Sequence, residues 1–289
     1  MDAQAVSLSS ALEWHPHFEV WVLIVGLLGG YFAGLRWLAP SRVSPDEDAA
    51  SPRQKVLFVM GVAALWVGAD WPVHELSEGY LFSVHMVQHT LFSLVAPPLL
   101  LAGTPPWLIR AVIGSGRSLS VIRALTRPLV ALLIFNAVIA ITHWPALVDF
   151  SLRSEVGHFS VHTVLFTSAV LMWWPVVNPL PEMSRLSEPG KMLYLFLQSI
   201  LPTVPASFLT FASAPLYHFY ETVPRLGLSV VDDQQIAGLI MKLGGGLLLW
   251  SVIAFLFFRW NARESSGAVE EITWADFERE LEVYELRKS

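Results

Sequence analysis

Long apolar windows recur along this 289-residue chain, and they restrict its fold more than any other feature. Each window is close to the roughly 20 residues that a helix needs to cross a bilayer. Only 15% of the residues are charged, whereas soluble domains carry about 25%. We therefore expect an all-α, polytopic membrane protein, a seven-transmembrane-helix bundle. Its expected spans lie at about 18–38, 55–70, 81–103, 127–144, 158–176, 191–212 and 233–258.

The expected organisation is an exoplasmic N-terminal segment at 1–17, a membrane domain at 18–258 and a cytoplasmic tail at 259–289. Residues 1–17 contain no Lys or Arg, so they do not resemble a cleavable signal peptide, which carries its positive charge first. The tail is expected to hold a short amphipathic helix that lies on the membrane or docks a partner. Its apolar residues recur at helical spacing: Trp274, Phe277, Leu281 and Tyr284.

The distribution of Lys and Arg predicts the orientation in the membrane. Fifteen of these residues fall on one side of the expected spans, and the other side has only Arg153 and Arg225. Because cytoplasmic loops carry the excess of positive charge, the N-terminus is expected outside and the C-terminus in the cytoplasm. Lys242 falls inside the last span. We expect it to have a carboxylate partner, Asp70 or Asp233, or a water-filled cavity, because an isolated charge is costly there.

The histidines are distributed on one side only. With this orientation all nine fall at or near the exoplasmic side: His15, His17, His74, His85, His89, His143, His158, His162 and His218. The chain has no cysteine, so disulfides and thiolate metal ligands are excluded. It also has no basic stripe of the kind that binds nucleic acid. A group of histidines near the outer surface is the remaining candidate for chemistry.

Two HxxxH pairs are the strongest candidates for a metal site. His85 with His89, and His158 with His162, each place two imidazoles on one helix face. Imidazole suits Cu, Zn, Fe and Ni. We predict that the four rings bind one metal or two close metals, with copper as the preferred metal and another divalent metal as the alternative. The competing interpretation is two interfacial ladders of histidines that hydrogen-bond to their neighbours.

Further residues are predicted as secondary ligands, and no catalytic residue is predicted. A thioether contribution would favour Cu(I). The secondary set consists of Met86, His143, Met241, Asp70, His74 and Asp233. Pro97 and Pro98 are expected to interrupt the third span, and Pro202 and Pro205 the sixth, as a hinge, an ion path or a packing kink.

Several motifs resemble the CtaG family of cytochrome c oxidase assembly factors over about residues 55–258. They are the DWP sequence at 70–72, HMVQH at 85–89 followed by PPLLLAG at 97–103, the 158–162 pair followed by WWP at 173–175, and DQQIAGLIM at 233–241. The resemblance implies a multi-pass protein of the bacterial plasma (inner) membrane that is needed to build the oxidase and supplies copper to it. Its implied partners are the lipid bilayer and an oxidase subunit or an exoplasmic copper chaperone.

Three functions remain open from the sequence. The preferred one is a binding and delivery protein, not an enzyme, that hands copper to the oxidase. The second is a di-metal membrane oxidoreductase, since such enzymes also use HxxxH boxes, although no HxxHH occurs here. The third is a metal-ion transporter, favoured by the interrupted spans but lacking a polar path through the cytoplasmic half.

Overall fold

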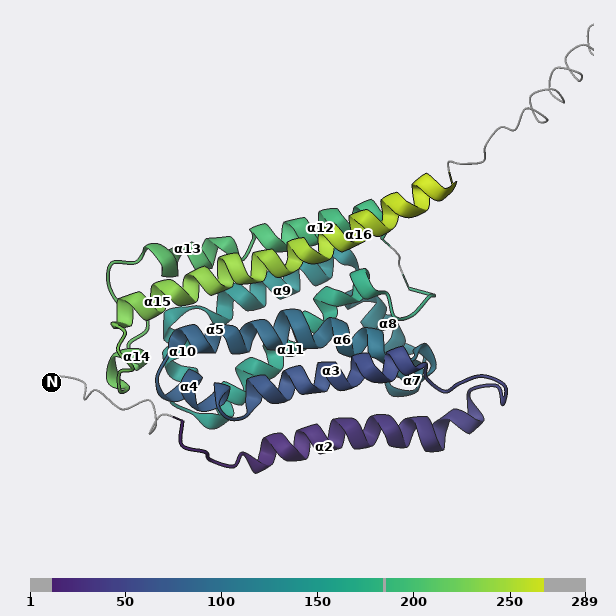
Figure 1. The fold of residues 1–289 in the computed structure, drawn as a ribbon, viewed down its shortest axis with the longest axis horizontal. Coiled ribbons are helices and arrows are strands. Elements are labelled where there is room, and N and C mark those ends of the chain that lie inside the picture. The colour runs from purple at the N-terminus through teal and green to yellow at the C-terminus, as the bar shows by residue number, and fades with distance from the viewer. Residues whose placement is uncertain (1–11, 184–185, 268–289) are drawn as a thin grey trace, which may run out of the picture.

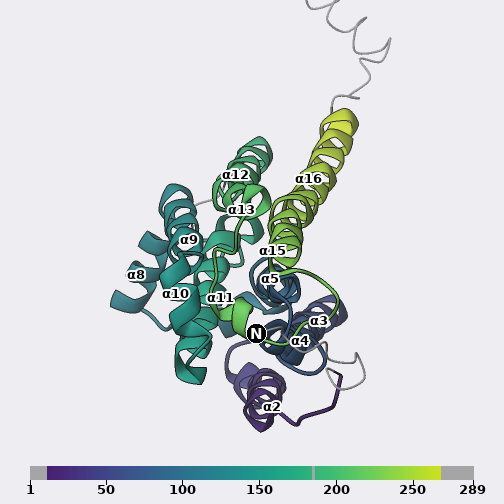
Figure 2. The same cartoon turned by 90° about the vertical axis from the view of Figure 1, so that its left-hand side faces the viewer.

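The computed structural model describes residues 12–183 and 186–267, and this part of the chain is helical, without strands. Its long helices lie side by side in an elongated bundle, with α2 (Phe18–Ala33) along one edge and α16 (Gly245–Gly267) along the opposite one (Figure 1). Viewed from one end, the remaining helices group between these two edges (Figure 2). The all-α prediction is confirmed for the described residues.

Within the described residues, six helices are long and apolar enough to cross a membrane, and a seventh span is obtained if one bent pair is counted. The bent pair is α8 (Arg117–Leu125) with α9 (Pro128–Thr142), and its two halves meet at 73°. At 15 residues, α9 alone is shorter than a usual span of about 20. The six are Phe18–Ser41, Pro52–Gly79, Phe82–Gly103, Glu155–Val177, Glu188–Phe211 and Val230–Ser265.

Short helices lie between the long ones, where the sequence suggested loops. At one end of the bundle are α4 (Val73–Gly79), α10 (Pro145–Ser151) and α14 (Phe219–Thr222), on the left of Figure 1. The opposite end carries α7 (Pro106–Ile113) together with α8. We call the end with α4, α10 and α14 the histidine end, because the histidines of the chain lie in or next to the elements that meet there.

The third span bends without breaking. It consists of α5 (Phe82–Thr90), a π-helical segment at Leu91–Val95 and α6 (Ala96–Gly103). Pro97 has no N–H to donate to the carbonyl of Ser93, four residues earlier. The indole of Trp173 donates to that carbonyl instead, at 2.9 Å. The interruption expected from Pro97 is therefore a π-helical turn whose freed carbonyl is satisfied from a neighbouring helix.

The sixth and seventh spans also depart from regular α-helix. The sixth breaks at Pro202, between α12 (Glu188–Ile200) and α13 (Thr203–Phe211), as expected from its prolines. The seventh joins α15 (Val230–Leu239) to α16 through a π-helical segment at Ile240–Gly244. This last helix continues past residue 258, where the tail was expected to begin. The predicted amphipathic helix of the tail lies outside the described residues.

Close contact between helices positions the third span. A side chain at Gly103 would place its Cβ 2.3 Å from the backbone nitrogen of Phe58, so only glycine permits this approach of α6 to α3 (Pro52–Ala69). The hydroxyl of Tyr31 donates to the Gly103 carbonyl at 2.9 Å and ties α2 to the same point. Small residues that let helix backbones approach are a common basis of packing in membranes.

Candidate metal centre

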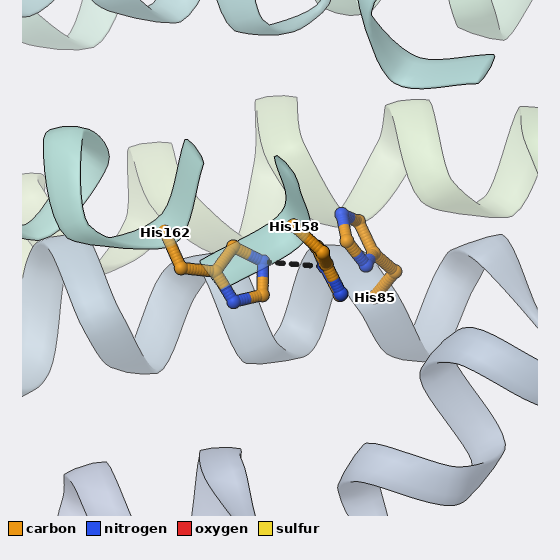
Figure 3. A group of neighbouring side chains, drawn as sticks. All are labelled: His85, His158 and His162. Carbon is orange, nitrogen blue, oxygen red and sulfur yellow. Dashed lines mark hydrogen bonds between the residues drawn. The ribbon is translucent and has the colours of Figure 1, made fainter. Parts of the chain in front are cut away.

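Three imidazoles from two helices converge at the histidine end. His85 comes from α5, while His158 and His162 come from the first turns of α11 (Glu155–Val177). One ring nitrogen of each lies within 4.8 Å of the others, and Figure 3 shows the three rings facing one another. His85 and His158 are buried and His162 is partly buried. Three nitrogen donors at this spacing form a set that could close around one ion.

The ring of His158 is held in one orientation by its two neighbours. Its Nδ1 lies 2.5 Å from Oε1 of Glu78 on α4, and its Nε2 lies 3.0 Å from Nε2 of His162. A carboxylate beside Nδ1 favours the tautomer with the proton on that nitrogen, which leaves the Nε2 lone pair available. The Nε2 atoms of His158 and His162 then face the same point. Metal-binding histidines commonly have a carboxylate at the other ring nitrogen in this way.

His89, the fourth predicted ligand, lies beside the three-histidine group and outside it. Its ring centroid is 4.3 Å from that of His85 and 5.1 Å from that of His162. Both of its nitrogens are buried and have no hydrogen-bond partner, and the same holds for Nδ1 of His85. The competing interpretation of two ladders requires hydrogen bonds to neighbours, and the described residues offer none to either nitrogen of His89.

The secondary candidates His143, Met86 and Met241 gather at a different place from the three-histidine group. Together with His89 they line a cavity of about 60 Å³. Nδ1 of His143 hydrogen-bonds to the carbonyl of Ile139 at 2.8 Å, and its Nε2 is buried without a partner. His143 makes a ring contact with His89, at 5.5 Å between centroids. The structure thus divides the predicted ligands into two neighbouring groups that meet at His89.

Asp70 is bound to other groups, although it was a candidate ligand. The indoles of Trp21 and Trp66 donate to its Oδ2 at 2.8 and 2.7 Å, and the backbone N–H of Trp71 donates to Oδ1. This carboxylate therefore ties α2 to the end of α3. The role of ligand that we predicted for it does not fit its partners.

Asp233, another candidate ligand, is also hydrogen-bonded to other groups of the protein. Its carboxylate accepts hydrogen bonds from the backbone N–H groups of Phe82 and Ser83, at 2.7 and 3.0 Å. It therefore caps the start of α5. The predicted pairing of Lys242 with Asp70 or Asp233 is wrong, because the Lys242 ammonium forms no ion pair with a described carboxylate. It lies 5.9 Å from the ring centroid of Phe211 instead.

A second set of histidines and carboxylates adjoins the group through Glu78. His74 on α4 contacts Glu78 at 3.2 Å, and its ring lies 4.4 Å from that of His17. Nε2 of His17 is 2.9 Å from Oε1 of Glu75. Partial burial by itself would lower the pKa of His17, but the hydrogen bonds and charges of Glu75 and Glu19 outweigh it and raise that pKa above its usual 6.5.

Sequence reasoning missed the two glutamates of α4. The signal was present, because His74 and Glu78 stand four residues apart, the spacing of two groups on one helix face. The segment was expected to be a loop, and in a loop a spacing of four residues does not predict that two side chains lie on the same face. Two histidines remain: His15 lies 4.0 Å from Oε1 of Glu75, and His218 is exposed and lies 3.5 Å from Oε2 of Glu221.

Comparison with known proteins agrees with the motifs. The sequence model of the cytochrome c oxidase caa3 assembly factor family, Caa3_CtaG, matches residues 29–263, most of the chain. No solved structure matches.

Curated relatives occur in mycobacteria. The uncharacterized protein Mb0105 of Mycobacterium bovis is 27% identical over 251 residues, which is 79% of this chain and 38% of that protein. The uncharacterized protein ML1998 of Mycobacterium leprae is 27% identical over 275 residues, 88% of this chain and 40% of that protein. The chain thus spans about two fifths of the length of these relatives. The match of the family model over residues 29–263 shows that the chain belongs to the family of cytochrome c oxidase caa3 assembly factors.

Proposed function

We propose that this assembly factor binds a copper ion through His85, His158 and His162 and delivers it to the oxidase on the exoplasmic side of the plasma membrane. Copper is cargo in this proposal, and the protein acts as a binding and delivery factor without catalysis. The receiving partner is an oxidase subunit or an exoplasmic copper chaperone. The family supports the assembly role, and the histidine group supports the choice of a metal.

The observation that carries the proposal is the geometry around His158. Its Nε2 faces Nε2 of His162 while Glu78 contacts its other nitrogen. An unoccupied pair of this kind must share a proton, since one ring has to donate to the other. For a metal ion to bind both Nε2 lone pairs, the shared proton has to move to the other nitrogen of the donor ring or leave to solvent. A nitrogen of His85 would complete the three-nitrogen set. Imidazole donors suit both oxidation states of copper.

The position of the group favours delivery toward the histidine end. At this end of the bundle Glu78 of α4 contacts both His158 and His74, and the ring of His74 packs against that of His17. The positive-inside rule predicts that this end faces outward. Copper enters or leaves by this end in the proposal.

The proposal is tested by copper binding to the purified protein. The wild-type chain is expected to bind copper stoichiometrically, and the double variant His85→Ala, His158→Ala is expected to lose the ion bound at the three-histidine group. Binding should weaken as the pH falls below about 6.5, because neutral imidazole is the ligand and protons compete with the metal. The measurement is a chelator competition followed by metal analysis.

His218→Ala is the matched control, because the His218 side chain is 71% exposed and lies outside the cluster. It should bind copper like the wild type. In cells that lack the native gene, the double variant should fail to restore copper-loaded oxidase, whereas His218→Ala should restore it. Equal binding by the double variant and the wild type would contradict the proposal.

A further inference from the structure

The cavity beside the three-histidine group has the donors of a second metal site. His89 lines it from α5, and His143 lines it from the position that directly follows α9. Met86 and Met241 line it from α5 and the π-helical segment of the seventh span. These four side chains come from three spans that are distant in sequence. Two residues with nitrogen donors and two with sulfur donors thus line one cavity of about 60 Å³.

The buried nitrogens of this cavity require an explanation. His89 is 7% exposed and His143 is 8% exposed. Both nitrogens of His89 and Nε2 of His143 lack hydrogen-bond partners. A buried polar atom without a partner is destabilising, and native proteins rarely keep several of them together without a ligand, water or a functional role. Ordinary packing explains the methionines, but it does not explain the imidazoles.

His143 is prepared as a ligand by its neighbour. Its Nδ1 is 2.8 Å from the Ile139 carbonyl, an acceptor that requires the proton to be on Nδ1. The lone pair is then on Nε2, the nitrogen without a partner. This is the usual arrangement of a metal-binding histidine, whose second nitrogen donates to a carbonyl or carboxylate.

We propose that His89, His143, Met86 and Met241 form a second copper site, selective for Cu(I). Thioether sulfur favours Cu(I), whereas the all-nitrogen group next to it accepts Cu(II) and Zn(II) as well. The choice of copper rests on the proposed function, but the donor set comes from the cavity itself. His89 is the common neighbour of both groups, with ring contacts to His85, His162 and His143. The two sites are therefore adjacent and could exchange an ion through this ring.

The test compares metals and variants in the purified chain kept under reductant. Wild-type protein should bind two equivalents of Cu(I), and X-ray absorption at the copper edge should show sulfur in the first coordination shell. The double variant Met86→Leu, Met241→Leu nearly conserves side-chain volume. It should bind one equivalent of Cu(I), lose the sulfur signal and keep the Zn(II) binding of the three-histidine group.

Met60→Leu is the matched control, because Met60 is 51% exposed on α3 and does not line the cavity. It should retain both equivalents and the sulfur signal. The inference is overturned if the wild type shows no sulfur around copper, or if the double methionine variant keeps the second equivalent. The sulfur measurement needs only wild-type protein, so poor folding of a variant does not remove the test.

The outcomes also separate this inference from the proposed function. If the variant His85→Ala, His158→Ala loses no copper while the methionine variant loses one equivalent with its sulfur signal, the three-histidine site fails and the thioether site stands. If the histidine variant loses one equivalent and the methionine variant none, the three-histidine site stands and the thioether site fails.

Discussion

At the scale of the residue, the chemistry of the candidate centre depends on neighbours that are not themselves ligands. Glu78 contacts Nδ1 of His158 at 2.5 Å and Nδ1 of His74 at 3.2 Å. A carboxylate in this place orients the ring, selects its tautomer and raises its basicity as a ligand. Its negative charge would also stabilise a metal cation bound by the three-histidine group. Glu78 is therefore a positioning residue for the three-histidine group.

We expect Glu78→Gln to weaken metal binding at that group by about 10- to 100-fold, the usual effect of losing such an outer partner. The amide keeps the shape of the side chain but removes its charge and can donate toward His158, which disfavours the required tautomer. The measurement is a competition titration with Zn(II), which reports on nitrogen ligands. Glu75→Gln on the same helix is the control, because Glu75 contacts His15 and His17 instead. Equal affinities in both variants would contradict this role.

At the scale of the element, α5 is the helix that carries His85, His89 and Met86, and contacts at both ends set its position. Asp233 on α15 caps its first two N–H groups. The Gln88 amide donates to the carbonyl of Gly68 at the end of α3, at 2.8 Å. A capping carboxylate at a helix N-terminus also interacts favourably with the helix dipole. The two contacts fix the ligands of both groups relative to α11.

We expect Asp233→Asn to lower the stability of the protein by about 1–3 kcal/mol, because a neutral amide has one acceptor oxygen and leaves a buried N–H unsatisfied. The start of α5 should shift, and the affinity for Zn(II) should fall with the stability. Thermal unfolding in detergent measures the first effect, and competition titration measures the second.

Asp232→Asn is a close control, since Asp232 is exposed and its Oδ2 accepts from Ser229 at 2.6 Å. It should change neither the stability nor the affinity by more than a small amount. If Asp233→Asn behaves in the same way as this neighbour, Asp233 does not hold the helix in place.

At the scale of the whole molecule, the histidines lie at one end and the arginines of α7 and α8 lie at the other. The histidine end includes α4, α10 and α14, whereas α7 and α8 at the other end carry Arg110, Arg117 and Arg123 (Figure 1). Large apolar side chains are exposed along the outer helices, as on Phe18, Val22 and Val25 of α2. Such a surface suits lipid. The charge distribution predicts which end faces the cytoplasm, and a labelling experiment tests it.

Single cysteines in this cysteine-free chain test the orientation without background. Glu221→Cys on α14 and Ser115→Cys between α7 and α8 replace exposed residues at opposite ends. An impermeant thiol reagent should label Glu221→Cys in intact cells or spheroplasts, and Ser115→Cys only after the membrane is opened. The reverse pattern would overturn the orientation and the exoplasmic delivery built on it.

The sequence by itself determined the helical class, the positions of the apolar spans and the family. These follow from local features: hydropathy over about 20 residues and short motifs such as HMVQH at 85–89. It also paired His85 with His89 and His158 with His162, because i, i+4 spacing aligns two rings on any helix. It did not reveal that α9 is only 15 residues long or that α16 extends to Gly267.

Only the tertiary structure decided how these donors are divided. Asp233 and the N–H groups that it caps are about 150 residues apart in sequence, and the sequence pattern contains no information on such a contact. The sequence pattern likewise does not show that Glu78 contacts His158, or that Met241 and His89 line the same cavity. The physical reason is that metal ligation and capping depend on distances of a few ångströms between different helices. Helix packing sets those distances, through contacts such as Gly103 against Phe58, whereas local spacing sets only which side chains share a face.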